Sequence, residues 1–158
     1  MSLQVAPRSF RALVAVAALA ALTALAGCGG GAPPVAPSAA STTGPDGVRE
    51  FDVSATDALR FDPASFSVRA GETIRFVVTN RGVGPHEFFV GDGAAQEEHA
   101  REMAASGMMH DHGMGIGLAR AETKTLEVTF SEPGQMLVGC HVPGHYGAGM
   151  RAVIEVTQ

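Results

Sequence analysis

The residue types best suited to chemistry gather near the end of the chain, in the stretch GCHVPGHYGAGM from Gly139 to Met150. Cys140, His145 and Met150 follow one another there at intervals of five residues. A thiolate and a neutral imidazole are good ligands for copper, and a thioether is a weak, soft one. Gly144 and the two glycines after it allow a turn tight enough to bring these side chains to one point. The stretch therefore predicts a metal-binding loop.

A blue-copper arrangement needs a second imidazole beside His145. Such a site places two His and one Cys in a trigonal plane with a distant axial Met. His141 adjoins Cys140, so its side chain should point to the opposite side of the strand and is not expected to bind the metal. His86 is the better candidate, because it begins the strand-like segment HEFFV after the turn-rich RGVGPH. In a sandwich, that strand end can lie beside the loop that follows Gly139.

Simpler interpretations of these residues remain open. Cys140 alone would be a small buried hydrophobic residue, and a single His such as His86 before a strand is often structural or exposed. Zinc sites rarely recruit a thioether, and a binuclear copper centre would need a second Cys in the loop. A hydrolase with a Cys-His pair would need an activated nucleophile and an oxyanion hole, of which the sequence gives no sign. The combination favours a mononuclear copper site.

A second group of sulfur and imidazole side chains lies mid-chain. Its members are His99, Met103, Met108, Met109, His110, His112 and Met114. Thioethers select Cu(I), and imidazole binds either oxidation state. This group is therefore a candidate site for a second copper ion, held weakly and without a fixed cage. The alternative is a surface loop, with Met103 packing a helix onto a sheet.

The elements that must position these residues are mostly short strands. Apolar and polar residues alternate over five to eight positions and are interrupted by Gly and Pro. The segments are FSVRAGETIRFVVTN, which contains two runs, HEFFV, TLEVTF, GQMLVGC and MRAVIEVT. This pattern predicts an antiparallel β-sandwich with one buried face in each sheet.

One segment between the strands has a helical composition. Residues Ala94 to Ser106 are rich in Ala, Glu and Arg, with Asp92 as a candidate N-cap and Gly107 as the stop. We therefore expect one short inserted helix. The following segment, GMMHDHGMGIG, has no apolar periodicity and is expected to be a Met/His-rich loop.

The first 47 residues predict export and a tether. Arg8 and Arg11 precede a short apolar run that ends in LAGC at Cys28. This resembles a lipoprotein signal peptide over residues 1–27, with Cys28 lipidated; the alternative is a plain secretory signal. Residues 28–47 are rich in Gly, Ala, Pro, Ser and Thr and predict a flexible linker. Residues 48–158 then form the folded domain, in the bacterial periplasm or on the cell surface, attached to a membrane only through the lipid.

Charge and cysteine content limit the partners. The formal net charge is −5 without a Lys/Arg cluster, so nucleic acid is not an expected partner. An acidic domain would sooner meet a basic protein surface. If Cys28 carries lipid, Cys140 is the one thiol left in an exported protein. Such an unpaired cysteine needs an explanation, which a metal would provide.

Taken together, CHVPGHYGAGM and the upstream PHEF resemble the type 1 copper site of the cupredoxins. The five-and-five spacing is more similar to that of rusticyanin than to that of azurin. LRFDPASFSVRAGETIRFVVTN is similar to the early cupredoxin strands, so the resemblance covers about Val48 to Gln158. The inserted helix and the Met/His-rich loop look most like those of cupredoxins linked to bacterial copper tolerance.

The resemblance implies a Greek-key cupredoxin β-sandwich of seven or eight strands. It implies one type 1 copper bound by His86, Cys140, His145 and Met150. The backbone N–H of Glu87 would donate a hydrogen bond to the thiolate. Glu87 is thus expected beside the ligands, and His141, which adjoins Cys140, is expected either beside them or on the surface.

Two functions compete on this scaffold, and neither is enzymatic. The first is single-electron transfer to a redox partner that docks at the apolar rim around His145. The second is copper handling outside the cytoplasm, with the Met/His-rich loop scavenging or delivering the ion. A monomer is expected in either case.

Overall fold

The computed structural model describes residues 39–106 and 111–158. The predicted signal peptide, the lipidation site Cys28, most of the linker, and Met108, Met109 and His110 lie outside these ranges. Within them, no helix is long and apolar enough to cross a membrane.

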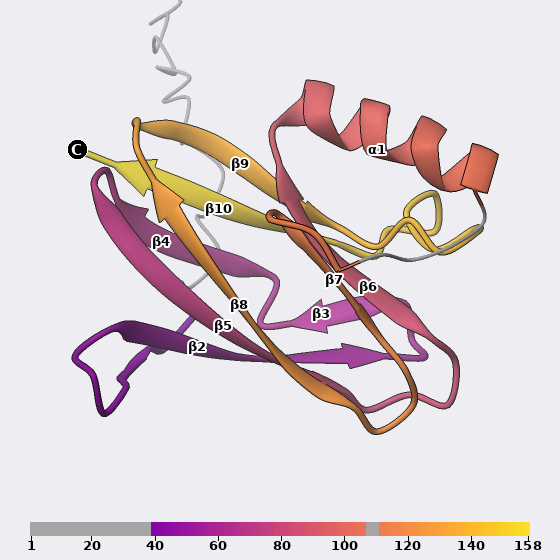
Figure 1. The fold of residues 1–158 in the computed structure, drawn as a ribbon, viewed down its shortest axis with the longest axis horizontal. Helices are drawn as coiled ribbons and strands as arrows, with labels where there is room; N and C mark the ends of the chain where they lie inside the picture. Colours follow the sequence, from indigo (N-terminus) through magenta and orange to yellow (C-terminus); the bar gives the residue numbers. More distant parts are fainter. Residues whose placement is uncertain (1–38, 107–110) are drawn as a thin grey trace, which may run out of the picture. The chain divides into compact units, whose positions relative to one another are not determined.

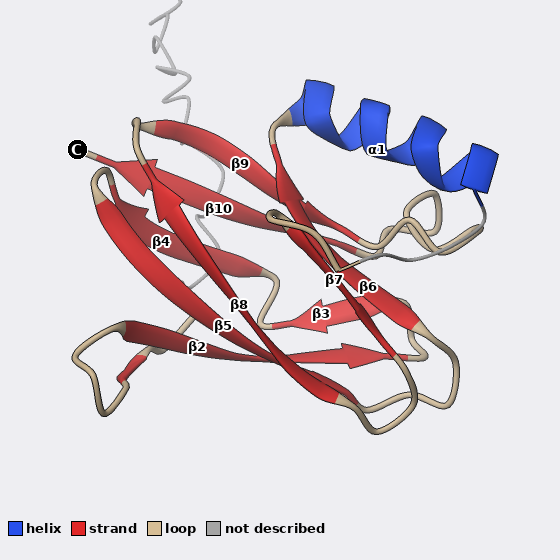
Figure 2. Cartoon of the chain, viewed as in Figure 1, coloured by secondary structure: helices blue, strands red, loops and turns tan. Residues whose placement is uncertain are grey.

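The described ranges contain ten strands and one helix, arranged as two sheets (Figures 1 and 2). In chain order the elements are β1 (Thr42–Thr43), β2 (Arg49–Thr56), β3 (Arg60–Asp62), β4 (Ser65–Arg69), β5 (Glu72–Asn80), β6 (His86–Gly91), α1 (Gly93–Ser106), β7 (Gly115–Leu118), β8 (Thr123–Phe130), β9 (Gly134–Gly139) and β10 (Arg151–Thr157). The first sheet has the order β1-β2-β5-β8, with β3 paired to β2, and the second has the order β4-β10-β9-β6-β7. The predicted all-β sandwich is confirmed. Its strand count exceeds seven or eight because β1 and β3, of two and three residues, are included.

The pairing is mixed, so the expectation of an antiparallel sandwich was wrong for two pairs. β2 pairs with β5 in parallel, and β4 pairs with β10 in parallel. The alternation of apolar and polar residues along a strand indicates which face is buried. It does not indicate whether the neighbouring strand runs parallel or antiparallel. Between β2 and β5 the chain crosses to the second sheet to form β4. It can therefore return beside β2 in the same direction, because parallel neighbours need such a crossover connection.

The core between the sheets is built around aromatic rings from both layers. Phe51 and Phe76 of the first sheet contact Phe66 of the second, with ring centroids 5.1 and 5.3 Å away. Phe88 of β6 lies 5.3 Å from Phe76. All four rings are fully buried, mostly at steep angles that suit aromatic quadrupoles. This cluster joins β6, which carries His86, to the rest of the sandwich.

β6 departs from the predicted pattern because all six of its residues are buried. Helix α1 covers its second face, as Figure 2 shows, and buries its own Gln96, His99 and Met103 against the sheet. The predicted helix is confirmed to within one residue, and its N-cap is Asp92, whose Oδ1 accepts the Ala95 N–H at 2.8 Å. One face of this strand therefore contacts the core and the other contacts the helix.

The segment expected to be entirely loop contains a strand that the sequence analysis missed. Gly115–Leu118 forms β7 and pairs with β6, with Leu118 opposite His86. Four residues with two glycines carry too little alternation to be recognised as a strand. β7 closes the second sheet beside the strand that begins with His86.

We predict that Phe76→Ala lowers the free energy of unfolding by about 3–5 kcal/mol, because it leaves a cavity among three other buried rings. Urea unfolding followed by circular dichroism measures this change. The exposed Asp52→Asn on β2 serves as the control and should stay within about 0.5 kcal/mol of the wild type. Equal effects of the two substitutions would contradict the aromatic core described above.

Candidate metal centre

Three of the predicted ligands converge at one end of the second sheet. His86 begins β6, Cys140 directly follows β9, and His145 lies in the turn before β10. One potential ligand atom from each lies within 4.8 Å of the others. Cys140 Sγ is 3.4 Å from His145 Nδ1, and the two imidazole centroids are 5.2 Å apart. The pairing of β6 with β9 brings together residues that are 54 positions apart.

The loop between β9 and β10 folds back on itself through its own backbone. Met150 N–H donates to His145 O at 3.0 Å, and Cys140 N–H donates to Met150 O at 3.2 Å. Gly144 and Gly149 adopt φ angles of 88° and 98°, which residues with a Cβ rarely adopt. Met150 is fully buried. Through these backbone hydrogen bonds the loop holds Met150, the predicted axial ligand, next to Cys140 and His145.

The described side chains fit a metal. Both ring nitrogens of His86 are buried, and neither has a hydrogen-bond partner among the described residues. Cys140 is a free, fully buried cysteine. Leaving a buried polar atom unpaired typically costs about 1–3 kcal/mol, so two orphaned nitrogens in one ring call for a ligand. One thiol, two imidazoles and a nearby thioether suit copper better than zinc.

Burial keeps the donor atoms uncharged in the metal-free protein. Desolvation raises the pKa of Cys140 to about 11. It lowers the pKa of His86 and of His145, so both imidazoles are neutral and have lone pairs to donate at neutral pH. A metal that binds here must displace the thiol proton.

Glu87 connects the thiol to the helix. Its backbone N–H donates to Cys140 Sγ at 3.3 Å. Its fully buried carboxylate accepts the His141 N–H through Oε2 at 3.1 Å and the His99 Nε2–H through Oε1 at 2.8 Å. The same residue thus contacts the thiol with its backbone and α1 with its side chain.

Gln96 provides a second connection from α1. Its side-chain carbonyl accepts the His141 Nε2–H at 2.7 Å, and its amide donates to Leu137 O of β9 at 3.0 Å. His141 is stacked on Tyr146 at 4.5 Å. The structure therefore places His141 beside the ligand loop in a buried position rather than on the surface. The sequence analysis missed Gln96, because a glutamine in a helix carries no local sign of its partner.

Comparison with known proteins identifies the family. A family profile described as copper-binding proteins of the plastocyanin/azurin family matches residues 49–157. The chain belongs to this family of cupredoxins. The predicted resemblance is thereby confirmed, and copper is the metal that the family binds.

Relatives and solved structures agree with this cupredoxin assignment. The copper-resistant cuproprotein CopI of Rubrivivax gelatinosus is 38% identical over 109 residues, which are 68% of this chain and 66% of the relative. CopI of Pseudomonas aeruginosa is 31% identical over 128 residues, 62% of this chain and 71% of the relative. The chain thus spans about two thirds of these relatives. A reduced auracyanin from Roseiflexus castenholzii shares the fold, with a TM-score of 0.63, 21% identity and coverage of 69% of this chain and 97% of that one.

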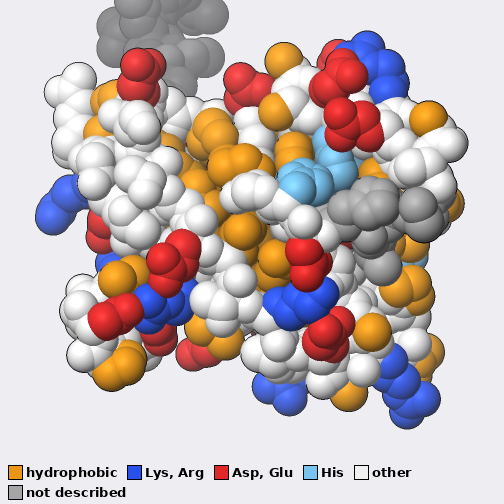
Figure 3. Space-filling view, in the orientation of Figure 1, with side chains coloured by type: hydrophobic (Ala, Val, Ile, Leu, Met, Phe, Trp, Pro, Cys, Tyr) orange, Lys and Arg blue, Asp and Glu red, His pale blue; other side chains and the backbone are white. Residues whose placement is uncertain are grey.

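The cupredoxin's second candidate site is only partly assembled among the described residues. The rings of His99 and His112 lie 5.2 Å apart, and Figure 3 shows histidine surface beside α1. Nδ1 of His99 is buried without a hydrogen bond and lies 3.5 Å from Glu102 Oε2. Met103 lies on the buried face of α1, and Met114 is half-buried against the core, so both pack as ordinary apolar residues. Met108, Met109 and His110 lie outside the described residues.

Asp57 is a neighbour of the site that the sequence analysis missed. It lies in the turn between β2 and β3, and its carboxylate is 3.7 Å from His86 Nε2. The backbone N–H groups of Val83 and Gly84 hold this carboxylate and lower its pKa. Nothing in the local sequence connects Asp57 with His86, since the contact depends on the packing of two distant loops.

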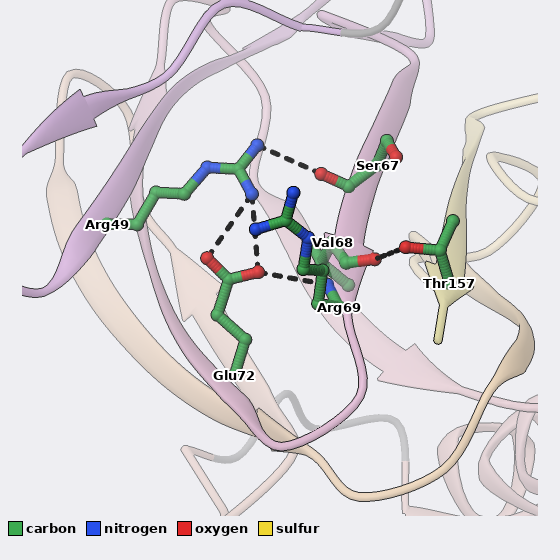
Figure 4. A pocket seen from close by; sticks show the side chains of 6 residues that line it. All are labelled: Arg49, Ser67, Val68, Arg69, Glu72 and Thr157. Atoms are coloured by element: carbon green, nitrogen blue, oxygen red, sulfur yellow. Dashed lines mark hydrogen bonds and ion pairs between the residues drawn. The ribbon is translucent and has the colours of Figure 1, made fainter.

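A separate cleft of about 490 Å³ lies at the other end of β10 from the metal centre (Figure 4). Its Arg49 already forms an ion pair with Glu72 at 3.3 Å and donates to Ser67 O at 2.9 Å. Thr157 at the end of β10 lines it, whereas the loop with His145 precedes the start of β10. The cleft takes no part in the copper site.

We predict that His99→Phe lowers the free energy of unfolding by about 2 kcal/mol or more. The substitution keeps an aromatic ring near Phe89, which stacks on His99 at 4.0 Å, but removes a hydrogen-bond donor from the buried Glu87 carboxylate. Thermal and urea unfolding of the metal-free protein measure the loss. His112→Phe is the matched control, because His112 is exposed and does not contact Glu87 through a described hydrogen bond. An equal loss in both variants would contradict this role of His99.

Proposed function

We propose that this cupredoxin handles copper outside the cytoplasm as part of copper resistance, and that it holds the ion in a type 1 site. The observation that carries the proposal is the convergence of His86, Cys140 and His145. The buried Met150 is hydrogen bonded through its backbone to His145 and Cys140. Support for a role in resistance comes from the two relatives described as copper-resistant cuproproteins. The predicted signal peptide and the lipidation of Cys28 complete the proposal, which places the protein in the periplasm or on the cell surface.

The residues of the site prepare it for one ion. His86 and His145 present neutral imidazoles, and Cys140 supplies a thiolate once its proton is displaced. The N–H of Glu87 then stabilises the negative sulfur. Copper, when bound, supplies a one-electron couple between Cu(II) and Cu(I). Because the ligands belong to paired strands and a hydrogen-bonded loop, they would move little between the two oxidation states.

Single-electron transfer to a redox protein is the second candidate function. The rigid attachment of His86 and Cys140 to paired strands favours it, since little rearrangement lowers the barrier to electron exchange. His145 is only half-buried and offers a route from the ion to the surface. Rapid electron exchange with a partner, together with unchanged copper resistance when the gene is deleted, would favour this function over copper handling.

We predict that Cys140→Ser abolishes an intense visible absorption band that the wild type develops with Cu(II), because that band needs a thiolate bound to copper. Titration of the purified mature chain with Cu(II), followed by absorption spectroscopy and metal analysis, measures the effect. In cells, the same variant should lose copper resistance. Cys28→Ser is a matched control that should keep the band, since it changes the other cysteine. A colourless wild type would refute the type 1 site.

We also predict that the wild type binds more than one equivalent of copper and that His112→Ala and Met109→Ala each weaken the second equivalent while leaving the visible band unchanged. Thioether and imidazole donors retain Cu(I), so equilibrium dialysis under reducing conditions is the measurement. Met136→Leu is the control, because Met136 is a half-buried thioether outside this group. If the wild type binds only one copper ion per chain, there is no second site, and electron transfer becomes the better supported function.

A further inference from the structure

We infer that Asp57 is a positioning residue for His86: its carboxylate accepts the Nε2–H of the imidazole whose Nδ1 binds copper, and its negative charge favours Cu(II) over Cu(I). This inference rests on the proposed copper site and adds a residue that belongs to a different loop.

The carboxylate of Asp57 is held in place from one side. Val83 N–H donates to Oδ2 at 2.8 Å, and Gly84 N–H donates to Oδ1 at 3.3 Å. These contacts fix the loop that leads into His86, two residues after Gly84. Oδ1 lies 3.7 Å from His86 Nε2. Asp57 is therefore tied both to the loop before the ligand and to the ligand's own ring.

The contact with Asp57 identifies the nitrogen that faces the metal. A Cβ placed on Gly82 would lie 2.9 Å from His86 Nε2 and would overlap Asp57 Oδ1, so all three groups meet at the outer edge of the ring. Nδ1 is the nitrogen across the ring from Asp57, and like Nε2 it is buried without a hydrogen bond. An imidazole that binds a metal through one nitrogen carries its proton on the other and usually donates it to an oxygen. The nearby acceptor for that proton is Asp57.

The separation of 3.7 Å is longer than a hydrogen bond. Asp57 is half-exposed, with 49% of its side-chain surface accessible, so a small rotation of its side chain closes the gap. Its half-exposure also leaves room for this movement without disturbing the core. Gly82 has no side chain to block the approach.

The charge of Asp57 acts differently on the two oxidation states. Cu(II) carries one more positive charge than Cu(I), so a nearby carboxylate stabilises Cu(II) more. Glu87 is the other acidic residue against the site, but its buried carboxylate is hydrogen bonded to His99 and to the His141 N–H. The Asp57 carboxylate is hydrogen bonded as well, to the Val83 and Gly84 N–H groups, but it lies beside a ligand imidazole. Removing its charge should therefore raise the reduction potential.

The test uses the full mature chain with Asp57→Asn, which keeps the size of the side chain and an oxygen for the Val83 N–H. Cu(II) and Cu(I) affinities are measured by competition with chelators, and the potential by spectroelectrochemical titration. We expect Cu(II) affinity to fall by roughly 10–100-fold, Cu(I) affinity to fall much less, and the potential to rise. Asp52→Asn is the control, since it removes an exposed carboxylate from β2 rather than from the turn that follows it.

A second pair of variants tests the same contact with the charge retained. Gly82→Ala would place its Cβ against both Asp57 Oδ1 and His86 Nε2 and should push the two groups apart, whereas Gly84→Ala in the same loop would place its Cβ at an ordinary 3.8 Å from Asp57 Oδ1. We expect Gly82→Ala to raise the potential and Gly84→Ala to leave it unchanged. If Asp57→Asn does not fold, these two glycine variants still test whether the contact of Asp57 with His86 sets the reduction potential.

The outcomes separate the inference from the proposed function. A coloured wild type, with equal losses of Cu(II) and Cu(I) affinity in Asp57→Asn, would mean that Asp57 only holds the loop, and the inference would fail alone. An unchanged potential in both Asp57→Asn and Gly82→Ala would overturn it as well. A wild type that forms no coloured Cu(II) complex would overturn the copper site and the inference together.

Discussion

The antiparallel pairing of β6 with β9 is the constraint on which the metal centre depends. Phe89 lies opposite Gly139 and Val90 opposite Val138, and this register sets His86 near the loop that begins at Cys140. A slip of one residue would turn every side chain of β6 to the opposite face of the sheet. His86 would then face the helix. The aromatic core fixes the register, because Phe88 must contact Phe76 between the sheets.

Helix α1 makes the second face of β6 as constrained as the first. A strand buried on both sides must satisfy every polar group within the protein. On the side of the helix, Glu87 and Gln96 meet most of this demand by bonding His99 and His141, and the hydrogen bonds end at the backbone of the ligand loop. The inserted helix is therefore part of the structure that orients Cys140, whether or not its own histidines ever bind copper.

The sequence revealed the parts of the site that are local. Cys140, His145 and Met150 share one loop, so their spacing alone indicates a metal. The helix could be predicted from its composition and its N-cap. His86 was chosen because such a site needs a second imidazole and because this residue precedes a strand, and the cupredoxin resemblance then agreed with the choice. The parallel strand pairs, β7 and the contacts of Glu87 with His99 could not be predicted. They depend on how the chain crosses between sheets and on which strand lies under the helix. Asp57 is the clearest such case, because two loops meet there only after folding.

Burial also explains how the chain can build this site inside a core before a metal arrives. A thiolate or an imidazolium in this position would carry a large desolvation cost. The pKa of Cys140 is raised to about 11 and the pKa of both imidazoles is lowered, so the metal-free site is a group of neutral side chains that the sandwich can enclose. The unpaired nitrogens of His86 remain as a cost, and a bound ion removes it. Copper binding and folding stability are therefore linked, since an ion that binds the folded chain more tightly than the unfolded one must stabilise it.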